Sequence, residues 1–423
     1  MPARYHSVTL NKALCRGCSD CLMHCPTQAI RVREGRAHII KELCIDCGAC
    51  IRYCNYHAKV AVTDGLESIL QFKHRVALPA PSFFAQFNRR THSVGQILDA
   101  LKALGFNEVF EVARGADIVT QALRDMLSDR SLPRPLISSA CPAVTRIIQI
   151  RFPSLLRNIV SLRQPMEVAA AMARKDYAAR HGVKPGEIGL FFITPCPAKV
   201  TAIRSPLGHE RSNLDGAISI RDVYKALQPI LPEHRHSKTE SAATPLGIGW
   251  ALNGGESEAA LCVNSLAVDG IDNVIHVLEE LENGQLSDLD FLEASACPGG
   301  CVGGPLVYGN SFIARNTIRA ILRDMPDRDP ADMKPPCPLP ASQLFNELPI
   351  GPNAALALDE DMGAALDMME QINQIQSRLP GHDCGACGSP SCAAFAEDVA
   401  RGYCGELDCV YMLKKHLEDM GKQ

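Results

Sequence analysis

The sequence of 423 residues lacks any run of about eighteen apolar residues, the length that would predict a membrane-spanning helix. It also lacks an excess of basic residues, because 43 Lys and Arg stand against 47 Asp and Glu, a formal net charge of −4. That balance excludes the basic surface typical of nucleic-acid-binding proteins, so we expect neither nucleic acid nor a membrane as a partner. The polar N-terminus shows no signal peptide, and we therefore expect a cytoplasmic protein.

Cysteine, by contrast, is abundant, with 19 residues in the chain. The cytoplasm keeps thiols reduced, so these cysteines are expected to bind metals and not to form a disulfide framework. Sixteen of them fall into three spaced sets, and the spacing in each set is compatible with an iron–sulfur site.

The first set consists of the run C-x2-C-x2-C-x3-C, which occurs twice within residues 1–65 with an offset of 29 residues. In bacterial ferredoxins the fourth cysteine of each run ligates the cluster of the other run. Zinc is the alternative metal, but eight cysteines in this repeat are hard to reconcile with two zinc sites. The pattern therefore predicts two 4Fe–4S clusters, one held by Cys15, Cys18, Cys21 and Cys54 and one by Cys44, Cys47, Cys50 and Cys25.

A second set lies near the C-terminus and comprises Cys384, Cys387, Cys392 and Cys409. Glycines flank these cysteines, and they allow backbone N–H groups to approach the sulfurs of a cluster. The segment resembles the small 4Fe–4S domain of several anaerobic redox proteins. We expect a third 4Fe–4S cluster here, with Cys404 as the alternative to Cys409 and zinc as the alternative metal.

The last set is scattered through a region in which short apolar segments alternate with helical ones, a pattern that predicts α/β architecture with parallel sheets. Parallel sheets place their ligand sites at the C-terminal ends of the strands. Three of the cysteines each follow a predicted strand, and a fourth lies close behind the third, so the four could converge. On the residues alone, a structural role for them stays open. The four are Cys141, Cys196, Cys297 and Cys301, and the strands are 135–138, 188–193 and 291–296.

Segments 139–142, 194–199 and 293–301, which contain these cysteines, resemble in order the three signature motifs of the FeFe hydrogenases. The resemblance extends over nearly the whole chain and implies three domains. They are a ferredoxin-like domain with two 4Fe–4S clusters over residues 1–65, a two-lobed parallel-sheet hydrogenase domain over 76–345, and a small helical 4Fe–4S domain over 355–423.

The same resemblance implies an H-cluster, which is a 4Fe–4S cluster joined to a diiron unit that carries CO and cyanide. Cys141, Cys196, Cys297 and Cys301 would hold the 4Fe–4S part, and Cys301 would also bridge to the diiron unit. Lys199 matches the family lysine that hydrogen-bonds a cyanide ligand. Pro81 and Ser82 match a pair that lines the diiron pocket.

Several positions depart from the pattern of the fast enzymes. Ala140 stands where they have the cysteine that passes protons to the diiron site, and segment 116–121 lacks the glutamates of their proton path. Thr194 and Ser295 replace methionines, and Met166 replaces a glutamine. These departures resemble the sensory-type FeFe hydrogenases.

The resemblance thus implies a hydrogenase of low activity that reacts reversibly with H2 (2 H+ + 2 e− = H2) and relays electrons through the accessory clusters. Its expected partners are H2 and protons, a redox or signalling protein, and the hydrogenase maturation machinery. The alternative is an iron–sulfur electron-transfer or scaffold protein whose hydrogenase-like domain holds only a 4Fe–4S cluster, similar to eukaryotic assembly factors.

Overall fold

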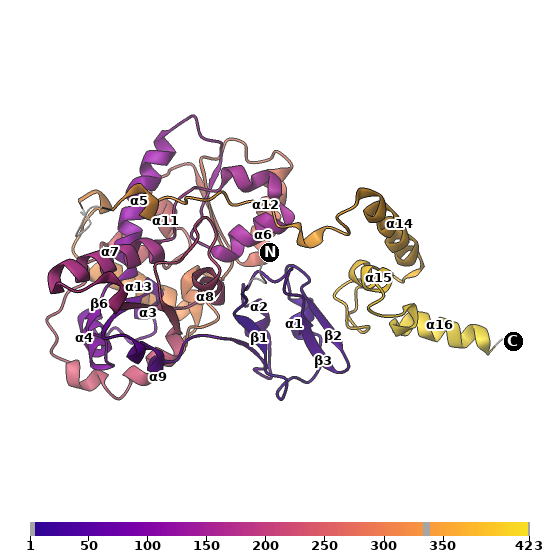
Figure 1. Ribbon diagram of the computed structural model, residues 1–423, viewed down its shortest axis with the longest axis horizontal. Helices are drawn as coiled ribbons and strands as arrows, with labels where there is room; N and C mark the ends of the chain where they lie inside the picture. The colour runs from indigo at the N-terminus through magenta and orange to yellow at the C-terminus, as the bar shows by residue number, and fades with distance from the viewer. Residues whose placement is uncertain (1–4, 333–338, 422–423) are drawn as a thin grey trace. The chain divides into compact units, whose positions relative to one another are not determined.

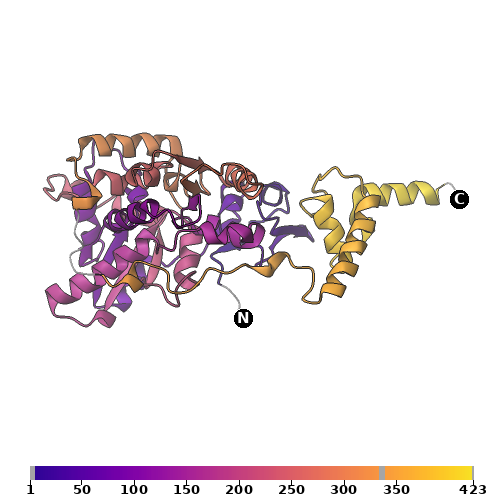
Figure 2. The same cartoon turned by 90° about the horizontal axis from the view of Figure 1, so that it is seen from above.

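The computed structural model describes residues 5–332 and 339–421, and its ribbon is drawn in two views in Figures 1 and 2. The chain forms two compact units. One consists of Val62–Pro352, and the other combines Met1–Ala61 with Asn353–Gln423. The first is called the hydrogenase unit below and the second the relay unit.

The hydrogenase unit contains two parallel sheets. The larger has the order β6-β5-β8-β9, built from β5 (His74–Pro79), β6 (Glu108–Val109), β8 (Ile188–Thr194) and β9 (Gly216–Ser219). All seven residues of β8 are buried, as expected for an inner parallel strand that is covered on both faces.

The smaller sheet has the order β10-β11-β7, from β7 (Leu136–Ile137), β10 (Ser265–Asp269) and β11 (Phe291–Ser295). These strands too are parallel. The predicted α/β class with two parallel-sheet lobes is therefore confirmed.

Helices connect and cover these strands (Figure 1). α5 and α7 pack against each other, and α7 also contacts β5 and β8. A helix begins after each of β5, β7 and β8. The first residue of each of these helices is proline, whose missing N–H costs nothing at that position. The helices of the unit are α3 (Pro81–Phe84), α4 (Val94–Ala103), α5 (Val112–Ser128), α6 (Pro142–Arg151), α7 (Pro165–His181), α8 (Pro197–Arg204), α9 (Ile220–Leu227), α10 (Pro245–Gly249), α11 (Gly255–Ala259), α12 (Ile271–Glu282) and α13 (Ser311–Asp324).

The N-terminal half of the relay unit repeats one small pattern. β1 (Val8–Leu10) pairs antiparallel with β4 (Lys59–Ala61), and β2 (Ile30–Arg33) pairs antiparallel with β3 (Arg36–Ile39). One short helix belongs to each cysteine run, α1 (Asp20–Met23) and α2 (Ala49–Arg52). The C-terminal half is helical, with α14 (Met362–Arg378), α15 (Cys392–Ala400) and α16 (Val410–Met420).

A buried ion-pair cluster joins the two halves of the relay unit. Asp398 on α15 accepts from Arg31 Nε at 2.5 Å, from Arg33 Nη2 at 2.8 Å and from the Ser389 hydroxyl at 2.6 Å. The Val32 N–H donates to the Gly388 carbonyl at 2.8 Å. Segments more than 350 residues apart in the sequence are thereby fixed to each other.

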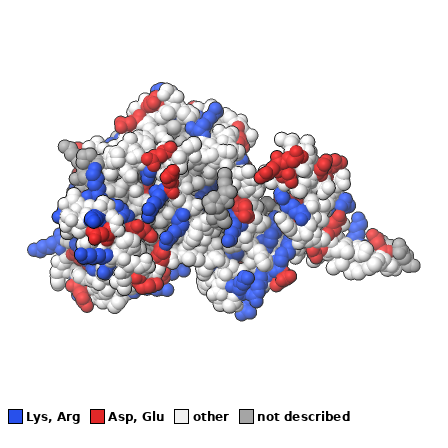
Figure 3. Space-filling model, in the orientation of Figure 1, with Lys and Arg blue, Asp and Glu red and all other residues white. Residues whose placement is uncertain are grey.

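Charged side chains of both signs are interspersed on the face drawn in Figure 3. Within residues 5–332 and 339–421, no helix has the length and apolar character needed to cross a membrane.

Candidate metal centres

One candidate site is a cavity inside the hydrogenase unit. Its walls come from the C-terminal ends of strands in both sheets, the position at which α/β proteins place their ligands. The four scattered cysteines all line it: Cys141, Cys196, Cys297 and Cys301.

Local backbone structure explains how two of these sulfurs reach the cavity. Cys141 and Cys196 are the N-cap residues of α6 and α8, so each leaves a strand end and opens a helix. Helix N-termini carry partial positive charge and favour an anionic group nearby. Thr194 stands where the fast enzymes have a methionine. Its hydroxyl accepts a hydrogen bond from the Cys196 N–H at 3.1 Å and so fixes this turn.

The other two cysteines lie on a tight loop after β11. Gly299 and Gly300 have φ of 80° and 87°, values that glycine adopts without strain. A side chain at Gly300 would also lie 2.6 Å from the backbone N of Asn253. The loop therefore requires glycine to bring Cys297 and Cys301 to one wall.

Lys199 is the cationic residue of the cavity. Its Nζ donates to Cys301 Sγ at 3.8 Å. Burial lowers the pKa of Lys199, but the nearby sulfurs of Cys301, Cys196 and Cys141 raise it more, so the net shift is upward. Burial raises the pKa of the Cys141 and Cys196 thiols, which means that their thiolates require further positive charge, as iron would provide.

The remaining predicted residues are distributed around this cavity. Pro81, Ala140 and Met166 line it, and so does Ser295. Ser82 is fully buried beside Pro81, and its hydroxyl has no hydrogen-bond partner among the described residues.

The first half of the relay unit contains two smaller cavities. One is lined by Cys15, Cys18, Cys21 and Cys54, the other by Cys25, Cys44, Cys47 and Cys50. These are the two sets that the exchange of fourth cysteines between the runs predicts. Backbone N–H groups point at the exchanged sulfurs, since Ala29 N donates to Cys25 Sγ and Ala58 N to Cys54 Sγ, both at 3.2 Å.

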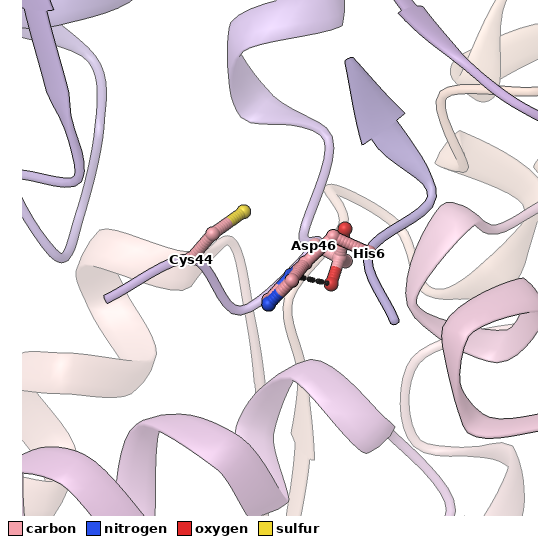
Figure 4. A group of neighbouring side chains, drawn as sticks. All are labelled: His6, Cys44 and Asp46. Atoms are coloured by element: carbon pink, nitrogen blue, oxygen red, sulfur yellow. Dashed lines mark hydrogen bonds and ion pairs between the residues drawn. The ribbon is translucent and has the colours of Figure 1, made fainter. Parts of the chain in front are cut away.

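His6, Cys44 and Asp46 lie close together, with possible ligand atoms within 4.8 Å of one another (Figure 4). His6 Nδ1 is 2.8 Å from Asp46 Oδ2, and the other carboxylate oxygen accepts the Val8 N–H at 3.0 Å. The carboxylate thus ties β1 to the second cysteine run. We interpret the group as support for the loop that carries Cys44.

The third small cavity belongs to the C-terminal half of the relay unit. Cys384, Cys387, Cys392 and Cys409 line it, and Cys404 does not. Arg33, which contacts Asp398, also donates to the Cys387 carbonyl at 2.9 Å. The placement favours Cys409 over Cys404 as the fourth ligand.

All four cavities fit iron–sulfur clusters. Each is lined by four cysteine sulfurs, backbone N–H groups reach several of them, and burial raises thiol pKa values, for example that of Cys21 to about 11. Thiolates held in this way are the usual ligands of such clusters.

Models of known protein families match the sequence of this chain. The model "Iron only hydrogenase large subunit, C-terminal domain" matches residues 73–265 and 252–305, more than half of the chain. The chain belongs to the iron-only hydrogenase family. A "4Fe-4S dicluster domain" matches residues 7–55 and a "Putative Fe-S cluster" domain matches residues 379–411, so this family member also carries accessory iron–sulfur domains.

Individual relatives are distant. The periplasmic Fe hydrogenase large subunit of Nitratidesulfovibrio vulgaris is 26% identical over 365 residues, which cover 72% of this chain and 86% of the relative. The probable cytosolic Fe-S cluster assembly factor oxy-4 of Caenorhabditis elegans is 22% identical over 348 residues, 68% of this chain and 76% of the relative. Two other hydrogenases match this chain, which spans only 55% of the length of one and 50% of the length of the other.

A solved variant of the FeFe-hydrogenase HydA1 from Chlamydomonas reinhardtii has the same fold, with a TM-score of 0.51 and 18% identity. The match covers 62% of this chain and 87% of the HydA1 chain.

Three polar residues of the hydrogenase cavity escaped the sequence analysis. Ser138, Glu256 and Glu293 all line it, and the Ser138 hydroxyl donates to Glu256 Oε2 at 2.5 Å. Burial raises the pKa of Glu256, and the neighbouring Glu293 carboxylate raises it further. Glu293 accepts from the backbone of Gly254 and Ser257, each at 2.8 Å.

Only one of these residues gave a signal in the sequence. Glu293 stands inside the apolar strand β11, where a buried carboxylate demands a partner. Glu256 lies on the five-residue helix α11, and only the tertiary fold brings it to the cavity.

Proposed function

We propose that this hydrogenase-family protein is of the sensory type and reacts slowly and reversibly with H2 at an H-cluster in the hydrogenase unit. The observation that carries the proposal is the cavity in which four cysteines and Lys199 meet while Ala140 occupies the wall beside Cys141. A methyl group has no exchangeable proton, and loss of a positioned proton donor typically costs about 10²–10⁴-fold in rate.

Each residue has a role in this proposal. Cys141, Cys196, Cys297 and Cys301 would hold the cluster, with Cys301 also a ligand of its diiron part, and the bound group would supply the cleavage and formation of the H–H bond. Lys199 holds an ammonium group at this wall and binds an anionic ligand there. Pro81 lines the pocket, and Ser82 supports it from the buried position next to Pro81, where its hydroxyl has no hydrogen-bond partner among the described residues.

Proton handling falls to the serine and glutamate that the cavity brings together. Because burial and Glu293 raise its pKa, Glu256 retains its proton at higher pH than an ordinary glutamate. Ser138 lies between Glu256 and the wall of Ala140, since it donates to the carboxylate and accepts the Ala140 N–H at 3.1 Å. Ser138 and Glu256 thus provide near this site the exchangeable proton that the Ala140 methyl group cannot provide.

Electrons reach or leave the protein through three 4Fe–4S clusters of the relay unit, held by the cysteine sets of its three cavities. The ion pairs of Asp398 hold the C-terminal cluster domain against the dicluster domain, which favours electron transfer between their clusters. A redox or signalling protein would read the state of this path. Insertion of the diiron unit requires the hydrogenase maturation machinery, and a reducing compartment such as the cytoplasm keeps the ligand thiols available.

A second candidate function is an iron–sulfur electron-transfer or scaffold protein whose hydrogenase unit holds only a 4Fe–4S cluster. The similarity to the assembly factor oxy-4 favours it. The cavity gives an argument against it, because its lining extends past the cysteines to Pro81, Met166 and Trp250.

The rate of hydrogen-driven dye reduction by anaerobically matured protein tests the sensory proposal. We expect measurable but slow turnover, about 10²–10⁴-fold below that of fast FeFe hydrogenases assayed in parallel. Turnover equal to theirs would overturn the sensory assignment.

A further inference from the structure

The two cysteine runs of the relay unit form an internal repeat that continues past the last cysteine of each run. Gln28 and His57 both have φ of 51°, and the residues after them donate to Cys25 and Cys54 over the same distance of 3.2 Å. The next repeat position holds Ile30 in the first run and Lys59 in the second. A buried apolar residue thus has a lysine as its counterpart.

Lys59 is buried like the isoleucine that it matches. Each of the two residues is 2% exposed, whereas Lys and Arg side chains are prominent on the surface drawn in Figure 3. Lys59 lies on β4, paired with Leu10 of β1, so its position is fixed by the sheet. Its Nζ has no hydrogen-bond partner among the described residues.

The surroundings of Lys59 point to a ligand that carries negative charge. It lines the cavity of Cys15, Cys18, Cys21 and Cys54, as Ile30 lines the cavity of the other set. Lys59 and four cysteine sulfurs therefore share one cavity.

An unpaired buried ammonium is costly unless an opposite charge compensates it. Four thiolates around a 4Fe–4S core give a cluster with net negative charge, and each one-electron reduction adds another. We propose that Lys59 raises the reduction potential of the cluster held by Cys15, Cys18, Cys21 and Cys54 by stabilising its reduced form. This inference rests on the assignment of clusters to these cavities, but not on the reaction with H2.

The test is a dithionite redox titration of the full chain with reconstituted clusters, followed by electron paramagnetic resonance. Lys59→Ile introduces the residue that the first run has at this position, and Lys59→Gln is a polar, uncharged second variant. In both variants we expect a lower reduction potential of the cluster held by Cys15, Cys18, Cys21 and Cys54. The reduction equilibrium should fall at least tenfold, which is about 59 mV for a one-electron couple. The cluster at Cys384, Cys387, Cys392 and Cys409 should keep its potential.

Lys12→Met is the matched control, because Lys12 is an exposed lysine of the same domain whose charge water and salt screen. We expect its potentials to equal those of the unaltered chain. Unchanged potentials in both Lys59 variants would overturn the proposal, as would an equal shift in Lys12→Met. Loss of the clusters from both Lys59 variants would also overturn it, since it would show a structural role instead.

The outcome is separable from that of the proposed function. A matured protein without CO and cyanide infrared bands would remove the H-cluster assignment and leave the Lys59 titration fully interpretable.

Discussion

At the scale of single residues, the hydrogenase cavity has an alanine at the position of the expected proton donor and is lined by two buried carboxylates. Ala140 offers only a methyl group, while Ser138 and Glu256 are hydrogen-bonded a short distance along the same wall. If the proposed function holds, its proton route would therefore differ from the one expected of fast enzymes.

Ala140→Cys is the direct test of the missing donor. We expect it to raise the rate of hydrogen uptake but not to the level of fast FeFe hydrogenases. The reason is that segment 116–121 lacks glutamates, and its Gln121 side chain donates to the Pro330 carbonyl instead of facing the cavity. Dye-coupled assays of the variant and a fast enzyme would decide, and equal rates would contradict the expectation.

Glu256→Gln tests the substitute route. A glutamine cannot release a proton, so we expect turnover to fall about 10²–10⁴-fold if Glu256 is the working acid–base group. Glu258→Gln on the same short helix is the control, because Glu258 is exposed and faces away from the cavity lining. A small effect of Glu256→Gln, similar to that of its control, would remove Glu256 from the route.

Glu256→Gln should also change how the free energy of unfolding depends on pH. The pKa of Glu256 is higher in the folded protein than its ordinary value, so the folded state binds more protons and stability falls as pH rises between those two values. Glu256→Gln should flatten this fall in the free energy of unfolding of metal-free protein, measured by urea titration at several pH values. An unchanged slope would show that Glu256 is ionised in the folded state.

At the scale of secondary-structure elements, strand ends and helix starts place the cysteines. β7, β8 and β11 were predicted from short apolar runs, and the structure has them at Leu136–Ile137, Ile188–Thr194 and Phe291–Ser295. That much is local, because buried parallel strands are apolar and a cysteine lies two to four residues after the end of each one. The spacing of the relay cysteines is local in the same sense.

Other features of the fold were out of reach of the sequence because they depend on distant contacts. Asp398 meets Arg31 across 367 residues, and no local pattern pairs these charges. Lys59 and Glu256 become informative only when their burial is known, since in the sequence a single lysine or glutamate is most often a solvated surface residue.

Asp398→Asn tests the anchor between the two halves of the relay unit. Removing one partner of a buried ion pair typically costs about 3–5 kcal/mol, so we expect faster hydrogen–deuterium exchange in segments 28–33 and 384–400. Glu397→Gln is the control, because its pair with Arg401 is a half-exposed contact along one helix, worth about 0.3–0.5 kcal/mol. Exchange equal in the two variants would show that the anchor contributes little.

At the scale of the whole molecule, the chain divides its cysteines between two units. Twelve of them lie in the three cavities of the relay unit, and four lie in the larger cavity of the hydrogenase unit. The hydrogenase cavity is larger than each of the three relay cavities, and two buried carboxylates line it. This difference in size and polarity is consistent with the proposal that the relay cavities hold electron-transfer clusters and the hydrogenase cavity a larger reactive group.

The most direct test of that account is infrared spectroscopy of the anaerobically matured full chain under hydrogen. We predict absorption bands from bound CO and cyanide that change when argon replaces hydrogen. Loss of these bands in Cys301→Ser, with the relay clusters still visible by electron paramagnetic resonance, would locate the diiron unit at the hydrogenase cavity. Fully matured protein that shows no CO or cyanide band would contradict the account and favour the iron–sulfur scaffold.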